Sequence, residues 1–169
     1  MSAPMPSSHE RVMKEDDFII SKTNTKGHIT YCNEIFMDMA AMSEAELLGK
    51  PHSIVRHPDM PKSIFKLLWK QIGEKKEVFA YVKNLSKDGS FYWVLANVTP
   101  SYDTKNNVIG YYSVRIKPKT SALEIIKPLY KTLLNIEASS GIDAAISHLH
   151  KLLEEKGVSY DEFVISIQA

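Results

Sequence analysis

The residues best suited to binding a ligand lie close together in residues 51–61. His52, Arg56, His57 and Asp59 bring two imidazoles, a guanidinium and a carboxylate into this short stretch. Proline fixes φ at about −65° and removes a backbone donor, so the three prolines of the stretch predict a stiff turn. A stiff turn with charged and polar side chains indicates a ligand pocket more than a surface connection. A run with helical spacing that includes Trp69 follows directly.

Metal binding and catalysis are two other chemistries for these residue types. His52, His57 and Asp59 carry common metal ligands, but the proline between the last two constrains them too strongly, so no metal site is predicted. The chain shows no Ser/His/Asp order, no glycine-rich phosphate loop and no kinase signature. The sequence therefore predicts no catalytic residues and no enzyme.

The whole chain has the composition of a soluble globular protein. It has 169 residues, of which 44% are hydrophobic, and a formal net charge of +1, which gives no reason to expect nucleic acid as a partner. Cys32 is the only cysteine, which excludes an intrachain disulfide and fits a reducing cytoplasm. The N-terminus lacks a secretory signal, and no apolar run is long enough to cross a membrane. We expect a cytoplasmic protein without direct membrane insertion.

The elements that must hold the turn are visible in the spacing of apolar residues and in the helix caps. Residues 1–15 are polar and rich in Ser and Pro, and they predict a flexible leader. Two strands are expected before the turn and three after it, at residues 18–23, 28–32, 78–85, 91–99 and 108–116. Helices are expected between the second and third strands, where Asn33 caps residues 34–41, Ser43 opens a capping box, and residues 61–75 follow the turn.

This order predicts an α+β fold over residues 16–118, with a five-stranded antiparallel sheet and short helices on one face. Residues 119–169 are predicted to form a C-terminal helical extension. The first expected helix is residues 124–136, which Pro128 either starts or breaks. A second helix is expected to be capped by Ser140, and a short third one follows a capping box at Ser159. Trp93 is assigned to the core or a sheet-face interface, and Cys32 to a buried strand position.

Several short motifs of the chain resemble the FAD-binding PAS domain of the bacterial aerotaxis receptor family. They are Tyr31-Cys32-Asn33, Pro51-His52, Val55-Arg56-His57-Pro58-Asp59-Met60-Pro61-Lys62, Trp69, Val82-Lys83-Asn84, Tyr92-Trp93-Val94 and Pro128-Leu129-Tyr130-Lys131. The resemblance implies a PAS fold for the five-stranded core. Aerotaxis receptors continue into a membrane anchor, a HAMP module and a signalling coiled coil, which this chain is expected to lack. It is therefore similar to the soluble PAS-only half of bipartite energy-taxis systems, the CetB-like proteins.

The resemblance also implies which residues shape or contact the cofactor, FAD. The matching positions are Asn33, His52, Arg56, His57, Asp59, Trp69 and Asn84. The Arg56 guanidinium suits the cofactor's phosphates or a reduced, anionic flavin ring, and Trp69 offers a plane for stacking. Asn84 and Asn97 are expected to reach the amide edge of the ring. For Asn97 this expectation rests on pocket geometry alone and not on the resemblance. Two plainer alternatives stay open, because Trp69 fits a core position and Asp59 can simply brace the turn.

The function that the resemblance implies is a redox sensor for energy taxis. The sheet and the tail would pass the redox state of FAD to a membrane chemoreceptor with a HAMP domain in trans, and this contact would draw the cytoplasmic protein to the inner membrane face. A homodimer stays open. So do a haem-binding PAS gas sensor, with His52 or His57 as axial ligand, and a cofactor-free PAS docking or dimerisation module. Blue-light adduct chemistry is not expected, because residues 52–60 contain no cysteine.

Overall fold

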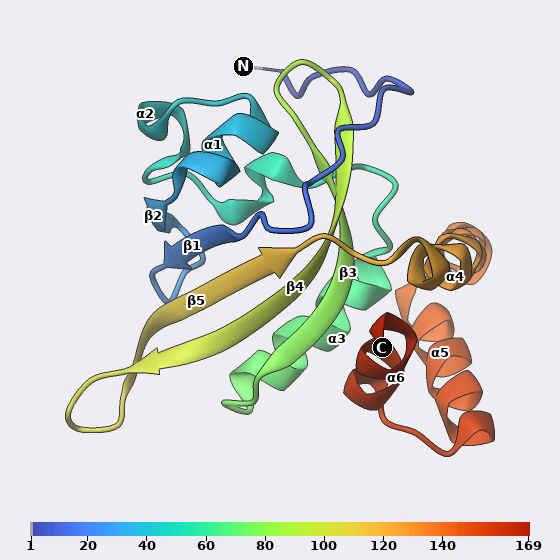
Figure 1. The fold of residues 1–169 in the computed structure, drawn as a ribbon. Helices are drawn as coiled ribbons and strands as arrows, with labels where there is room; N and C mark the ends of the chain where they lie inside the picture. Colours follow the sequence, from blue (N-terminus) through green and yellow to red (C-terminus); the bar gives the residue numbers. More distant parts are fainter. Residues whose placement is uncertain (1) are drawn as a thin grey trace.

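A computed structural model describes residues 2–169 of the chain; Met1, the first residue of the expected leader, lies outside the described residues (Figure 1). The elements are, in order, β1 Ile19–Thr23, β2 Ile29–Cys32, α1 Glu34–Ala40, α2 Glu44–Leu47, the 3-10 helix η1 His52–Val55, α3 Lys62–Gly73, β3 Val78–Leu85, β4 Phe91–Tyr102, β5 Val108–Ile116, α4 Thr120–Ser140, α5 Ile142–Lys156 and α6 Tyr160–Gln168. Within residues 2–169, no helix combines the length and the apolarity that crossing a membrane requires.

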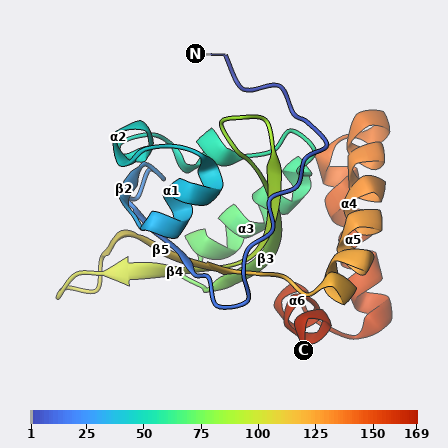
Figure 2. The same cartoon turned by 45° about the horizontal axis from the view of Figure 1, so that its top comes forward.

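The strands form one antiparallel sheet in the order β2-β1-β5-β4-β3, which confirms the predicted fold. Because β1 pairs with β5, the first and last strands are neighbours, and the segment from α1 to α3 must cross one face of the sheet. Figures 1 and 2 show these helices on that face, which we call the inner face. Cys32 and Trp93 are buried, as expected.

The pairing register aligns side chains of different strands in rows across the inner face. Ile19 lies opposite Arg115, Arg115 opposite Ala96, and Ala96 opposite Ala80. Side chains along a strand alternate between the two faces, so the neighbours of these residues point the other way. The inner face therefore carries one buried arginine among small and apolar side chains.

Three of the predicted side-chain caps, Asn33, Ser43 and Ser159, begin their helices. The Asn33 side chain accepts a hydrogen bond from the Phe36 amide at 3.1 Å and so caps α1. Ser43 with Glu46 and Ser159 with Glu162 form complete capping boxes at α2 and α6. These caps satisfy backbone donors that have no partner within the helix.

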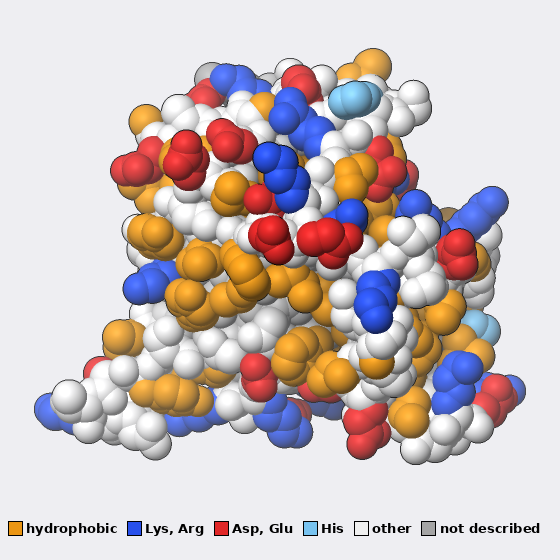
Figure 3. Space-filling model, viewed as in Figure 1, with side chains coloured by type: hydrophobic (Ala, Val, Ile, Leu, Met, Phe, Trp, Pro, Cys, Tyr) orange, Lys and Arg blue, Asp and Glu red, His pale blue; other side chains and the backbone are white. Residues whose placement is uncertain are grey.

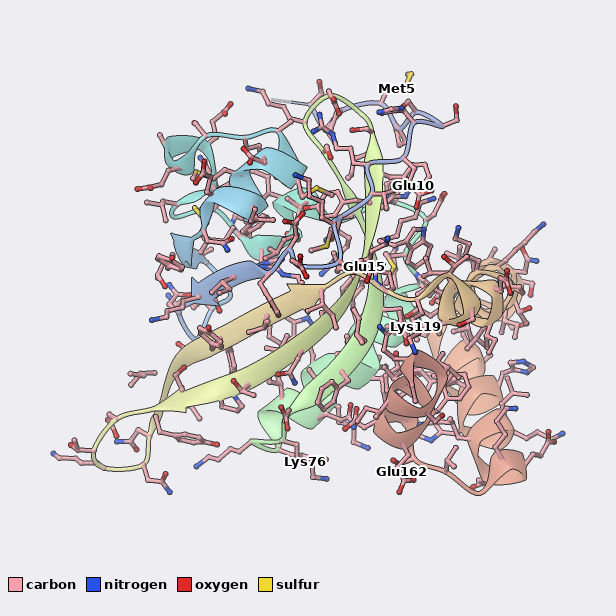
Figure 4. The ribbon with its side chains drawn as sticks, in the orientation of Figure 1. Met5, Glu10, Glu15, Lys76, Lys119 and Glu162 are labelled. Atoms are coloured by element: carbon pink, nitrogen blue, oxygen red, sulfur yellow. The ribbon has the colours of Figure 1, made fainter. Side chains whose placement is uncertain are left out.

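The N-terminal segment differs from the flexible leader that the sequence predicts. The Ser7 amide donates to the Gly89 carbonyl at 2.8 Å, the Arg11 amide to the Phe91 carbonyl at 2.7 Å, and Met13 is buried. The physical reason lies in the sheet, because β5 ends at Ile116 opposite Leu95 and leaves the start of β4 with a free edge. Figure 4 shows the labelled Glu10 beside the end of the β3–β4 hairpin.

The first helix of the tail also differs from its prediction, because α4 runs unbroken from Thr120 to Ser140 with Pro128 inside it. Proline removes one hydrogen bond, but the helix continues because buried side chains such as Ile126, Tyr130 and Leu133 hold it on both sides of Pro128. The next helix, α5, begins at Gly141 without a side-chain cap, so Ser140 does not serve as one.

The tail helices pack beside β3 and α3, and they share one hydrophobic cluster with β3 and β4 (Figures 1 and 2). The Tyr130 hydroxyl donates to the Tyr81 carbonyl, and the Tyr81 hydroxyl donates to the Val164 carbonyl at 3.2 Å. The Trp93 and Tyr130 rings lie 6.0 Å apart. The tail is therefore part of the folded core, and it follows β5 after a short connection at residues 117–119.

Two neighbouring isoleucines of α4 test this packing. Ile126 is 0% exposed and Ile125 is 47% exposed. We expect Ile126→Ala to lower the free energy of unfolding by about 2–4 kcal/mol, because it removes buried methylenes and leaves a cavity. Ile125→Ala, its control, should change it by less than about 0.5 kcal/mol. Urea unfolding of both variants measures the difference, and equal midpoints would mean that the tail does not pack as described.

Candidate functional site

A cavity of about 330 Å³ lies between the inner face of the sheet, η1 and α3. Its apolar wall includes Leu68, Ile72, Val78, Ala80, Val82 and Val98. Its polar side chains include His52, Arg56, Asn84, Ser113 and Arg115. A largely apolar cavity with a few converging polar groups is typical of sites for small molecules and cofactors, and its volume is within their usual range.

Four of the predicted site residues line this cavity, namely His52, Arg56, Trp69 and Asn84. The guanidinium carbon of Arg56 lies 3.8 Å from the centre of the Phe65 ring, which holds it by a cation–π contact. Trp69 is 52% exposed, so it lies at the mouth of the cavity and not in the hydrophobic core. The Asn84 side chain is buried, and its backbone pairs with that of Arg56.

The other three predicted residues lie outside the cavity lining. Asn33 caps α1, and its side chain also accepts from the Ile20 amide at 3.0 Å. His57 is buried edge-on against Phe91, and its Nδ1 accepts from the Asp59 amide at 3.0 Å. The Asp59 side chain is 63% exposed and lies 3.3 Å from the Lys83 ammonium. These residues brace the turn and the strands around the cavity, and their predicted role at a cofactor stays a prediction.

Asn97 was expected to reach the same pocket as Asn84, and this expectation is wrong. Its neighbours Ala96 and Val98 line the cavity, so the alternation of the strand turns Asn97 to the outer face. There its side-chain amide donates to a carboxylate oxygen of Glu77 at 2.7 Å.

Arg115 is the site residue that the sequence analysis missed. It is 2% exposed; its Nη1 lies 3.1 Å from Nε2 of His52, its Nη2 donates to the Ser21 hydroxyl, and its Nε has no partner. The guanidinium also lies 4.5 Å from the centre of the Phe36 ring. Within residues 2–169 no carboxylate pairs with it. A charged residue at an inward-facing position of an otherwise apolar strand was the signal that could have identified it.

Burial and the adjacent charge of Arg115 fix the protonation state of His52. Burial first, and then the charge of Arg115, lowers the pKa of His52 to about 3, so the imidazole is neutral at physiological pH. Burial also lowers the pKa of Arg115, to about 10, and the guanidinium stays charged. A neutral His52 with its proton on Nδ1 accepts at Nε2 from both Arg115 and the hydroxyl of Ser21, which lies 3.1 Å away. The cavity floor therefore holds one net positive charge.

Comparison with known proteins identifies the fold that carries this cavity. The model of the PAS fold matches residues 29–115, which span β2 to β5 and all of the helices that form the cavity. The chain belongs to the PAS family. The cavity enclosed by its short helices and the inner face of its sheet therefore lies within the PAS domain of the chain.

Two relatives of this PAS domain are a receptor and a transcriptional regulator. The chain is 33% identical to the aerotaxis receptor of Escherichia coli over 132 residues, which are 78% of this chain and 26% of the receptor. It is 27% identical to the bacterioopsin transcriptional activator of Halobacterium salinarum over 93 residues, which are 55% of this chain and 14% of the activator. The chain therefore spans about a quarter or less of the length of these relatives.

Solved structures share the fold. A light-oxygen-voltage domain studied with a flavin analogue superimposes with a TM-score of 0.57 over 68% of this chain and 86% of that domain, at 22% sequence identity. At this level of identity the likeness extends to the fold alone.

The protonation state of His52 predicts how stability depends on pH. Because its pKa is lower in the folded chain than the usual 6.5, the unfolded chain binds the proton first, and stability falls as the pH drops from about 6.5 towards 3. This single group contributes up to about 1.4 kcal/mol per pH unit in that window. We expect His52→Gln to show a shallower decline than the wild type in urea unfolding at pH 7, 6, 5 and 4.

His150→Gln, at an exposed histidine of α5, is the matched control and should keep the wild-type slope. Since burial also lowers the pKa of His57, some slope will remain in His52→Gln. Parallel pH profiles for His52→Gln and the wild type would contradict the neutral state of His52.

Proposed function

We propose that the cavity binds FAD and that the chain is a redox sensor for energy taxis. The observation that carries this proposal is Arg115, a buried cation on the cavity floor whose charge no carboxylate of residues 2–169 balances. Burying a cation without an acidic partner is costly, so a ligand with anionic character is the natural counterpart. The half-exposed indole of Trp69 adds an aromatic plane at the mouth.

The residues around the cavity fit a flavin dinucleotide. Leu68, Ile72 and the valines of β3 and β4 would contact the faces of the ring system, and the Asn84 amide would meet its polar edge. The enclosed volume suits a ring system and not a whole dinucleotide, so the phosphates and adenine would extend past Trp69 to the exposed Lys26 at the mouth. Arg56, beside Phe65, is a second cation for the phosphates.

A bound flavin supplies reversible electron transfer, and its ring gains negative charge on reduction. Arg115 would stabilise this charge from a site where water does not screen it, and the neutral His52 would hold the guanidinium in place without balancing its charge. The strength of the contact between Arg115 and the ligand would thus depend on redox state. Such a contact can shift the populations of two conformations of the sheet and tail.

The signalling role is inferred from the relatives. The aerotaxis receptor is a receptor by name, and its match covers 78% of this chain. We infer that this chain acts in the cytoplasm without catalysis and relays its redox state, through contact in trans, to a membrane chemoreceptor with a HAMP domain. Recruitment to the inner membrane face and a homodimer are part of the same proposal.

Haem binding is less well supported by the geometry. Nε2 of His52 is in contact with both Arg115 and Ser21, so it is not free to bind iron. His57 lies outside the cavity lining. A cofactor-free docking module would leave the charge of Arg115 unbalanced.

The absorption spectrum of the purified chain, supplemented with FAD or haem, distinguishes these functions. We expect flavin bands and release of FAD on denaturation. Trp69→Ala should weaken FAD binding about tenfold, because stacking of aromatic rings contributes about 1.5 kcal/mol. Lys70→Ala, at the next and exposed position of α3, should bind as the wild type does. A Soret band would replace the proposal with a haem sensor, and a chain that takes up neither cofactor would leave only the docking module.

The charge of Arg115 predicts the reduction potential of the bound flavin. Arg115→Met should lower the midpoint potential by about 60 mV or more, since 59 mV corresponds to a tenfold change for one electron. Arg115→Lys should restore much of this loss, and Lys22→Met, on the outer face of β1, should have no effect. Spectroelectrochemical titration of the four proteins measures the potentials. Equal potentials for Arg115→Met and the wild type would mean that this charge does not act on the ring.

A further inference from the structure

Helix α3, which forms one wall of the cavity, lacks a capping side chain of its own. It begins after Pro61, whose side chain can accept no hydrogen bond from the first backbone amides. The first amides of a helix have no partner within the helix, and they carry the positive end of its dipole. Something outside α3 must satisfy them, because Ser63 at the start of the helix is buried.

The tail supplies the missing cap. One carboxylate oxygen of Glu137, on α4, accepts from the Ser63 amide at 2.7 Å, and the other accepts from the Lys62 amide at 3.2 Å. A carboxylate at this position neutralises the end of the dipole and satisfies two backbone donors at once. A salt bridge of 2.7 Å between Lys66 and Asp143 joins α3 to α5, but both side chains are exposed and it contributes little.

Helix α3 therefore lies between the cavity and the tail. Phe65, Leu68, Trp69 and Ile72 line the cavity. On another side of the same helix, Leu67 and Gln71 line a second hollow with Leu149 and Leu153 of α5. Helix α3 contacts β3 of the sheet as well as α4 and α5 of the tail. A rigid helix cannot move on one side alone, so the position of the tail and the shape of the cavity are connected.

We propose that Glu137 is a positioning residue for the cofactor site, and that cofactor binding and docking of the tail favour one another through α3. This inference rests on the proposed function and deepens it. FAD stacked on Trp69 favours the orientation of α3 that Glu137 caps, so it shifts the equilibrium of the tail toward its docked position. By reciprocity, release of the tail weakens FAD binding by the same factor. A partner that binds the released tail would thereby also sense whether the cavity is filled.

The outer surface leaves room for such a partner. Figure 3 shows apolar side chains exposed over the outer face of the sheet, next to the tail helices. The tail buries Tyr81 of β3. The Tyr81 hydroxyl forms hydrogen bonds with the Val164 carbonyl and the Gln168 side chain of α6, and these hold the tail on the strand. Movement of the tail would expose this surface of β3 together with the start of α3.

The first experiment needs no cofactor and examines the cap. Hydrogen exchange of full-length Glu137→Ala, Glu137→Gln and Glu124→Ala is compared with the wild type. Glu124 is the matched control, an exposed carboxylate of the same helix. We expect faster exchange in α3 for Glu137→Ala, an intermediate rate for Glu137→Gln, which keeps one acceptor oxygen, and wild-type exchange for Glu124→Ala. Unchanged exchange in Glu137→Ala overturns the proposal.

The second experiment adds FAD. Glu137→Ala should bind FAD about two- to tenfold more weakly, because only part of the stabilisation that a cap gives to its helix acts on the cofactor site. The fluorescence of the bound flavin should rise as Trp69 quenches it less, which general destabilisation of the fold would not cause. Glu137→Gln should recover part of both effects. In the wild type, FAD should slow hydrogen exchange in α4–α6.

The outcomes separate the two proposals. A wild-type chain that takes up no FAD overturns the proposed function and the coupling with it. Equal FAD affinity and equal flavin fluorescence in Glu137→Ala and the wild type overturn the coupling alone, because FAD binding by the wild type would still support the proposed function.

Discussion

The buried charge of Arg115 is the interaction on which the arrangement of the cavity depends. The guanidinium is held by the Ser21 hydroxyl of the neighbouring strand β1, by Nε2 of His52 from η1, and by the face of the Phe36 ring from α1. These contacts require the pairing of β1 with β5, the position of α1 on the inner face, and a neutral imidazole. A change of register by one residue would turn Arg115 to the outer face and remove all of them.

What the sequence predicts well is what short stretches determine by themselves. The bounds of β3 and β5 agree with the prediction because apolar alternation and flanking turns define them. The capping boxes at Ser43 and Ser159 agree because each involves residues only three positions apart. Of the site, His52, Arg56, Trp69 and Asn84 were found through the resemblance to a known family, and all four line the cavity.

What the sequence misses depends on partners far away in the chain. Residues 7–11 look like a flexible leader until the free edge at the start of β4 is known, since that edge supplies their hydrogen bonds. Pro128 predicts a break in α4 unless the burial of Ile126 and Tyr130 is known. The cap of α3 comes from Glu137, which no local motif connects to Ser63. The charge of Arg115 in a strand was a signal, but its contacts with Ser21 and His52 depend on strand pairing and on η1, which no local pattern shows.

The absence of a carboxylate beside Arg115, among the residues the structure describes, determines how the charge of a ligand would act in the cavity. An Asp or Glu at the position of His52 would balance the guanidinium within the protein, and a ligand's charge would then change little in the site. A neutral histidine holds the guanidinium in the same geometry and leaves its charge unbalanced. In a site of low dielectric, such a charge interacts strongly with any charge that a ligand gains or loses. The pair of Arg115 and neutral His52 therefore makes the cavity sensitive to ligand charge, and α3 with its cap from Glu137 connects that cavity to the tail.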